Sequence, residues 1–104
     1  MELQYRLMGK SENKYRKTLA EIKYIIEEKG LKNKRRYPKL VAYRQKIACI
    51  LSEHYNLKLK EVANLVGYKE HSNVLHAIKT VNNTTEKNNP LYFQYYTEIS
   101  DLLL

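Results

Sequence analysis

The sequence of 104 residues is long enough for one compact domain, and no apolar run approaches the roughly 18 residues that a membrane-spanning helix needs. Its 19 Lys and Arg residues exceed its 11 Asp and Glu residues, and the resulting net charge of +8 favours a polyanion as partner. The N-terminus lacks the long apolar core of a secretory signal, and the one cysteine, Cys49, lies in the apolar run IACIL, so we expect a buried thiol in a protein of the reducing cytoplasm.

The first predicted element is an amphipathic helix over residues 12–29. Ser11 has the short polar side chain of an N-cap residue, and Gly30 ends the helix. The apolar stripe, at the spacing of a helix face, consists of Tyr15, Leu19, Ile22 and Ile26.

The second predicted helix begins at Pro38, a residue suited to a first helical turn, and ends near Tyr55 or Asn56. Its inward positions are Val41, Ile47, Ile50, Leu51 and Tyr55, and its outward positions are Lys39, Arg44 and Lys46. The helix overlaps the most basic part of the chain, because residues 29–46 contain eight Lys or Arg and no Asp or Glu. A charge surplus concentrated in one segment favours a phosphate-binding surface over a merely solvated run.

A short third helix over residues 58–65 precedes Gly67, and a fourth follows over 70–82. The predicted inward residues of these two helices are Leu59, Val62, Ala63, Leu65, Val74, Leu75, Ala77, Ile78 and Val81. NNTTEKNN is a polar linker, after which Asn89 and Pro90 have the character of an N-cap and a first helical residue. The apolar side of this fifth helix comprises Leu91, Tyr92, Tyr95 or Tyr96, Ile99, Leu102 and Leu103. No segment alternates as a strand does, so the chain is predicted to be all-α.

The third and fourth helices, with the turn between them, have the pattern of a helix-turn-helix. Ala63 is small where two helices must cross closely, and Gly67 can adopt the positive φ of a sharp turn. The second helix of such a pair enters the major groove of DNA. At about 100° per residue, the polar side chains that gather opposite its apolar stripe are Ser72, Asn73, His76, Lys79 and Thr80.

Four blocks of the chain resemble the C-terminal DNA-binding domain of the bacterial replication initiator DnaA. They are KRR at 34–36, RQ at 44–45, KLKEVA at 58–63 and GYKEHSNVLHA at 67–77, and they align without a gap to the family blocks KRR, RQ, SLPEIG and GGRDHTTVLHA. The resemblance implies an all-α, TrpR-like fold of about five helices with a central helix-turn-helix, and double-stranded DNA as the partner.

The resemblance also implies roles for individual residues. Arg36 matches an arginine that enters the minor groove, where narrow AT-rich DNA concentrates negative potential. Arg44 matches an arginine that contacts a guanine through its guanidinium fork, and Gln45 matches a neighbouring contact residue. Within the last block, Lys69 stands for the family's arginine and Glu70 for its Asp. His71 and His76 stand for the first and second His, and Ser72 and Asn73 stand for the Thr pair.

Three departures from the family pattern affect specificity. Ser72 has no methyl group to offer to thymine, whereas Asn73 suits adenine, whose N6 donates and whose N7 accepts. Tyr68 replaces the second glycine of the turn. Lys46 and Ile47 replace a pair that is normally apolar then small, so the register of Arg44 and Gln45 can be slipped by one residue.

The family's initiator also carries an ATPase domain with a GxxxxGK[ST] loop, and the three glycines of this chain form no such motif. We therefore expect no nucleotide, no cofactor and no enzyme activity. If complete, the chain would be the DNA-binding part alone, from a phage or mobile element, or a small regulator that competes for origin-like sites.

Rival interpretations rest on weaker patterns. His71 and His76 are five residues apart, whereas two zinc ligands on one helix prefer a spacing of four. A catalytic pair of Cys49 and His54 lacks an activating charge. Most of the ten tyrosines have core spacing, although Tyr37 and Tyr43 lie among basic residues and could lie along a DNA backbone or stack on bases.

A second class of function is protein interaction, in which the terminal helices form a homodimer or contact a replication or virion protein. We favour DNA binding because the basic segment has little use in a scaffold. The expected organisation is a single domain over 1–104, with an N-terminal helix extension at 1–30, a helix-turn-helix core at 34–81 and a C-terminal helix at 90–104. The expected function is sequence-specific DNA binding in replication initiation or its regulation, in the cytoplasm at the nucleoid. The expected DNA-binding residues are Lys34, Arg35, Arg36, Lys39, Arg44, Gln45, Lys69, His71, Ser72, Asn73, His76 and Lys79.

Overall fold

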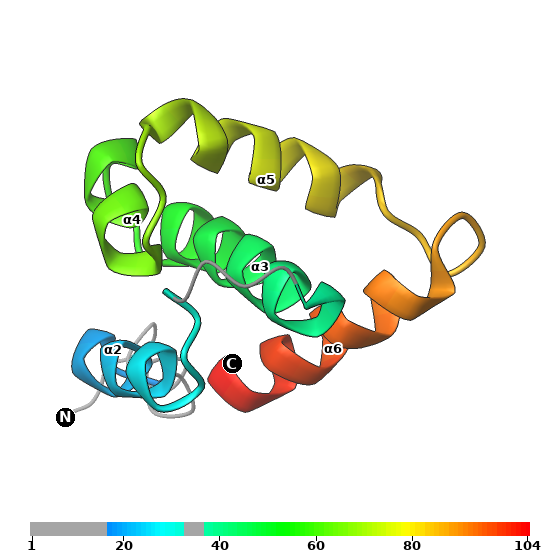
Figure 1. The fold of residues 1–104 in the computed structure, drawn as a ribbon, viewed down its shortest axis with the longest axis horizontal. Helices are drawn as coiled ribbons and strands as arrows, with labels where there is room; N and C mark the ends of the chain where they lie inside the picture. The colour runs from blue at the N-terminus through cyan, green and yellow to red at the C-terminus, as the bar shows by residue number, and fades with distance from the viewer. Residues whose placement is uncertain (1–16, 33–36) are drawn as a thin grey trace, which may run out of the picture.

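The computed structural model describes residues 17–32 and 37–104, which form five helices and no strand. The all-α prediction is therefore confirmed. The longest helix, α3 (Pro38–His54), runs through the centre of the molecule (Figure 1). Within the described residues, no helix has the combined length and apolar character required to cross a membrane.

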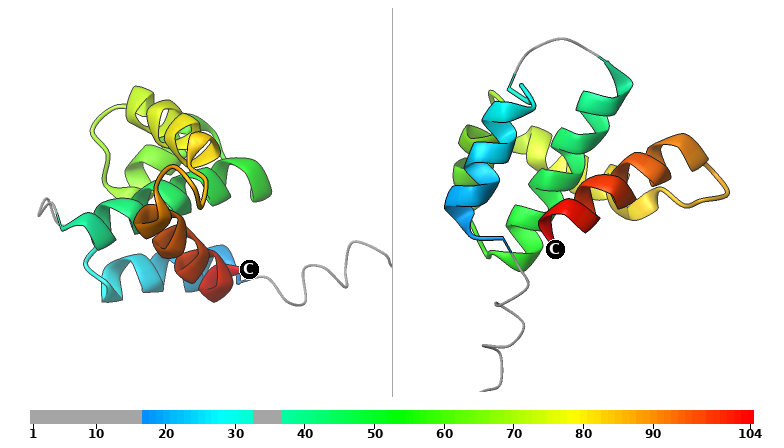
Figure 2. Two further views of the ribbon diagram at one scale, coloured as in Figure 1. Left: turned by 90° about the vertical axis from the view of Figure 1, so that its right-hand side faces the viewer. Right: turned by 90° about the horizontal axis from the view of Figure 1, so that it is seen from below.

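The other helices surround α3. Helix α5 (His71–Asn83) lies on one side of it, and α2 (Leu19–Glu28) and α6 (Pro90–Leu103) lie on the opposite side (Figures 1 and 2). The short α4 (Leu59–Val66) packs beside one end of α3 and leads directly into α5. This arrangement leaves the side of α5 that faces away from α3 open.

Helix α2 starts later than the sequence pattern predicts. Thr18 is its N-cap: the Thr18 amide donates to Glu21 Oε1 at 2.8 Å, and the Glu21 amide donates to Thr18 Oγ1 at 3.2 Å. Residues 17 and 18 are not helical, so the predicted helix over 12–29 is wrong there, and the predicted cap Ser11 lies outside the described residues. Thr18 is the N-cap residue because Glu21, three residues later, completes a reciprocal capping box with it.

Helix α3 begins at Pro38 and ends at His54, with Tyr55 as its C-cap, as predicted. It is more deeply buried than its polar residues suggested. Its buried residues are Ala42, Tyr43, Ile47, Ala48, Cys49, Ile50 and Leu51. The burial of Cys49 confirms one prediction, whereas the burial of Tyr43 removes that residue from the candidates for base stacking.

One main core joins all five helices. Its fully buried members include Ile22 of α2, Ile47 of α3, Val62 of α4, Val74 of α5 and Ile99 of α6, each with at most 1% of its surface exposed. Burying apolar side chains of this size is the main favourable contribution to folding.

Three leucines that were predicted to face inward are instead exposed. They are Leu75, Leu91 and Leu102, at 53%, 49% and 41% exposure. Helical spacing identifies an apolar face about 100° wide, but the neighbouring helices cover only its centre. The edges of the face then remain in solvent.

The last helix secures the beginning of α2. Helix α6 is capped by Asn89, whose side chain accepts from the Tyr92 amide at 3.2 Å, as the sequence predicted. Near its end, the Leu103 carbonyl accepts from the Lys17 amide at 3.1 Å, and the Tyr55 hydroxyl donates to the Lys17 carbonyl. The segment that precedes α2 is thus joined to both α3 and α6.

Candidate nucleic-acid interface

The turn between α4 and α5 has the geometry that a helix-turn-helix requires. Gly67 adopts the left-handed conformation with φ at +87°, and the amides of Gly67 and Tyr68 both donate to the Ala63 carbonyl at 2.9 Å. A positive φ is readily adopted only by glycine. The predicted turn is therefore confirmed, and it directs the chain into α5.

Helix α5 buries one face and exposes a polar one. Val74, Ala77 and Val81 are buried against the core. The exposed side chains on the rest of the helix are His71, Ser72, Asn73, Leu75, His76, Lys79, Asn82 and Asn83, and Ile78 and Thr80 are half-buried. No described part of the chain covers the polar edge, so its donors and acceptors face solvent.

The basic residues that were predicted to contact DNA fall in two groups. Lys34, Arg35 and Arg36 lie outside the described residues. Lys39 and Lys69 are exposed, Lys39 in the first turn of α3 and Lys69 in the turn before α5. The Lys39 ammonium nitrogen lies 6.0 Å from the ring centroid of Tyr43 and 5.9 Å from that of Tyr95, so aromatic rings help to fix its position.

Arg44 and Gln45 are each engaged inside the protein. The Arg44 Nε donates to the backbone carbonyl of Leu31 at 2.6 Å, and Arg44 is half-buried. The Tyr96 hydroxyl donates to Gln45 Oε1 at 2.7 Å, which directs the Gln45 side chain toward α6. The two residues that the RQ pattern pairs thus bond to different parts of the chain, Arg44 to the turn after α2 and Gln45 to α6.

A family model described as the bacterial DnaA protein helix-turn-helix matches residues 17–81. This match covers well over half of the chain and extends from the start of the described residues through most of α5. The chain belongs to the bacterial DnaA helix-turn-helix family. Comparisons with characterised proteins and with solved structures find no further match.

Membership of the DnaA family makes this module a DNA-binding helix-turn-helix, in which α5 is the second helix of the motif. The family match ends at residue 81, so α6 is not part of it. In this DnaA-type domain α6 nevertheless packs on α3: Ile99 and Leu103 are buried in the main core, and Tyr96 is buried in a cluster with Val81 of α5.

Lys32 is a basic residue near the DnaA-type turn that the sequence patterns did not single out. It is exposed, and its backbone packs on Gly67: a Cβ at Gly67 would lie 3.2 Å from the Lys32 Cα and 3.1 Å from its Cγ. The sequence carries no signal for this contact beyond the place of Lys32 in the basic segment, because the residues are far apart along the chain.

Two other groups bear on the alternative functions of this DnaA-type chain. Burial and a hydrogen bond to Glu53 raise the pKa of Cys49 to about 11, so its thiol is protonated at neutral pH and is a poor nucleophile. His71 and His76 are exposed, and in the described parts of the chain no three His, Cys, Asp or Glu side chains gather as metal ligands.

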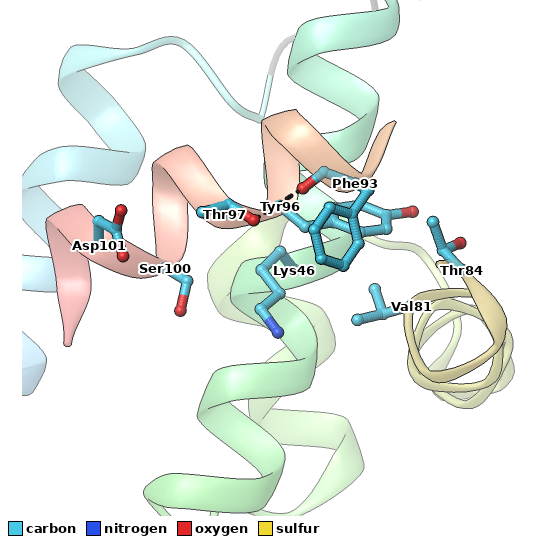
Figure 3. A pocket seen from close by; sticks show the side chains of 8 residues that line it. All are labelled: Lys46, Val81, Thr84, Phe93, Tyr96, Thr97, Ser100 and Asp101. Atoms are coloured by element: carbon cyan, nitrogen blue, oxygen red, sulfur yellow. Dashed lines mark hydrogen bonds between the residues drawn. The ribbon is translucent and has the colours of Figure 1, made fainter. Parts of the chain in front are cut away.

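A pocket of about 250 Å³ opens where α3, α6 and the end of α5 meet (Figure 3). Its apolar surface comes from Val81, Phe93 and Tyr96, while Lys46 and Asp101 supply one charge of each sign. The remaining lining residues are the hydroxyl-bearing Thr84, Thr97 and Ser100. The lining residues include no histidine or cysteine, so they form no nucleophile–base pair of the Ser–His or Cys–His kind.

Proposed function

We propose that this chain binds double-stranded DNA with sequence preference, through its DnaA-type helix-turn-helix, and that it acts in replication initiation or in the regulation of initiation. The DNA would be chromosomal or phage DNA in the cytoplasm, where the protein would associate with the nucleoid. The proposal extends the family's DNA binding to specificity and to a process.

The open polar edge of α5 is the observation that carries the proposal. His71, Ser72, Asn73 and His76 are exposed on the helix that a helix-turn-helix inserts into the major groove. These side chains combine donors and acceptors without a net negative charge, and such groups recognise base edges. Asn73 has the amide that pairs with adenine N6 and N7.

Exposed basic residues would hold the DNA backbone. Lys39 and Lys69 are exposed at the starts of α3 and α5, and we assign them to phosphates, with Lys79 further along α5. From the resemblance of the KRR block, Lys34 and Arg35 would also contact phosphates, and Arg36 would enter the neighbouring minor groove. Gln45 is omitted from the interface because Tyr96 occupies its amide oxygen.

The experiment is a binding selection from random DNA duplexes at two salt concentrations. We expect one sequence motif to be enriched at both concentrations, while total retention falls at the higher one because phosphate contacts are lost. Retention of all duplexes in equal proportion would contradict sequence preference, and no retention at low salt would contradict DNA binding by this chain.

Protein interaction remains a second candidate because α6 exposes apolar side chains. Leu91, Phe93 and Leu102 have exposed fractions of 49%, 38% and 41%. Sedimentation of the free protein distinguishes protein interaction from DNA binding. If the wild type is a dimer, and alanine at Leu91 and Leu102 makes it a monomer without changing its affinity for duplex DNA, α6 is an interaction surface.

A further inference from the structure

The side chain of Arg44 holds the chain at Leu31, shortly before the KRR block at 34–36. Its Nε donates to the Leu31 carbonyl at 2.6 Å, and Leu31 is fully buried beneath the end of α2. A buried carbonyl that loses its donor is unfavourable, since water cannot replace the hydrogen bond. Arg44 therefore fixes the chain at Leu31, three residues before the KRR block at 34–36.

The next residue, Lys32, is fixed from another element. Its backbone and the base of its side chain pack against Gly67, so closely that a Cβ on the glycine would lie 3.1–3.2 Å from Lys32 and push it aside. Leu31 is thus held by Arg44 of α3, and the adjacent Lys32 is held by Gly67 of the helix-turn-helix. The segment is positioned relative to the turn that precedes α5.

Tyr68 connects these two contacts. It follows Gly67 in the turn, is half-buried, and packs against the core. Burial raises the pKa of Tyr68, and the positive charge of Arg44 opposes that increase. The charge of Arg44 therefore acts on Tyr68 in the turn, while its Nε is bonded to Leu31.

From these contacts we infer that Arg44 is a positioning residue, which holds the Leu31–Lys32 segment against the helix-turn-helix so that Lys32 contacts a backbone phosphate in register with α5. The inference rests on the proposed DNA binding. It gives Arg44 a different role from the guanine contact that the family resemblance implies, and it adds Lys32 to the DNA-binding residues.

The first test distinguishes a guanine contact from positioning. The duplex obtained by selection is prepared with each guanine in turn replaced by 7-deazaguanine, which lacks the N7 acceptor. We expect Arg44→Ala to weaken binding by about the same factor, on the order of tenfold, on every duplex. A single guanine whose replacement weakens the wild type but not Arg44→Ala would identify a direct base contact and overturn the inference.

The second test measures the coupling between Arg44 and Lys32. In the wild type, Lys32→Ala should weaken binding roughly threefold and reduce the slope of log K against log salt by about one. In Arg44→Ala, the same change should have almost no effect on either quantity, because Lys32 is no longer held in place. Additive effects in the double variant would overturn the inference.

Matched variants separate this role from folding and from net charge. Lys23 is exposed on α2, and Lys23→Ala removes the same charge without a predicted change in salt slope. Arg44→Lys retains a positive charge, and urea unfolding identifies which variants are folded. If Arg44→Ala is unfolded, Arg44→Lys is used in the cycle, and an effect of Lys32→Ala as large in that variant as in the wild type would overturn the inference. A wild type that binds no duplex would overturn both proposals, whereas binding with additive variants would overturn only this one.

Discussion

Two glycines of this domain share a backbone conformation and differ in their surroundings. Gly30 and Gly67 have φ angles of +64° and +87°. A Cβ at Gly30 would meet nothing within 4 Å, whereas one at Gly67 would press on Lys32. The pair therefore separates the cost of a positive φ from the cost of close packing.

We expect Gly30→Ala to lower the free energy of unfolding by about 1 kcal/mol, because a side chain with positive φ is strained. Gly67→Ala should lower it by about 2 kcal/mol or more, since Lys32 must also move. Urea unfolding of the two variants provides the comparison. Equal losses of unfolding free energy in the two variants would mean that the contact between Gly67 and Lys32 adds nothing to the cost of the substitution.

Tyr43 provides a pH-dependent contribution to stability. Burial and a hydrogen bond to Glu98, at 2.9 Å, raise the pKa of Tyr43 to about 12, from an ordinary value of about 10 in the unfolded chain. The folded state therefore holds the phenol proton more tightly. Its contribution is fully present below pH 10 and is lost as the pH rises toward 12.

Tyr43→Phe should cost about 1 kcal/mol at neutral pH and make the alkaline decline in unfolding free energy shallower between pH 10 and 12. Urea unfolding at a series of pH values measures both effects. Tyr24→Phe is the control, because Tyr24 is 65% exposed. An unchanged alkaline decline in Tyr43→Phe would contradict the assignment.

Asn73 is the residue of α5 whose chemistry predicts a base preference. Asn73→Ala should relax discrimination at one base pair by roughly 1–3 kcal/mol, because it removes a bidentate contact to adenine. Affinities for duplexes that vary at each position measure this loss. Asn82→Ala, an exposed asparagine further along α5, should leave the discrimination pattern intact. A wild-type pattern in Asn73→Ala would exclude Asn73 from base recognition.

At the scale of elements, the sequence predicts helices well where caps are explicit. Pro38, Gly67 and the Asn89–Pro90 pair each mark a boundary that the structure confirms. Proline fixes φ in a first helical turn, asparagine caps the helix, and glycine readily adopts the positive φ that ends one. The predicted start of α2 was wrong because the segment contains more than one residue suited to an N-cap. Only the pairing of Thr18 with Glu21 decides between them.

Contacts between elements are less accessible from the sequence. Tyr43, Arg44 and Gln45 are consecutive polar or aromatic residues in a basic segment, and the pattern assigned all three to DNA or to bases. In the structure they bond to Glu98, Leu31 and Tyr96, which lie in α6 and at the end of α2. Periodicity identifies the face of a helix but not the partner that covers it.

Helix α6 offers a matched pair of neighbouring leucines. Leu103 is fully buried in the core, whereas Leu102 is 41% exposed. Leu103→Ala should lower the free energy of unfolding by roughly 2–5 kcal/mol through lost burial and a cavity, and Leu102→Ala should change it by about 0.5 kcal/mol or less. Chemical denaturation measures both, and similar losses would show that α6 is not packed as described.

The charge of the whole molecule is unevenly distributed. The net charge of +8 resides in the segment 29–46, while the segment 82–104, which includes α6, has one Lys against three acidic residues. Approach to a polyanion should therefore be oriented by the basic segment.

Arg36→Ala tests the contribution of the basic loop at this scale. Because the change removes a proposed minor-groove contact, it should weaken binding to every duplex and reduce the salt slope by about one. Titrations at several salt concentrations give the slope, and Lys87→Ala, in the linker before α6, is the control. An unaltered slope for Arg36→Ala would place that residue outside the interface.

The backbone hydrogen bond between Lys17 and Leu103 has a consequence for protein engineering. Since the two ends of the described domain are in contact, a few glycines could close the chain into a ring once residues 1–16 are removed, at little cost in loop entropy. New termini could then be opened at the exposed tip over residues 85–88. Such a circular permutant would change the order of the helices along the chain while keeping α4, α5 and the basic segment in their native places.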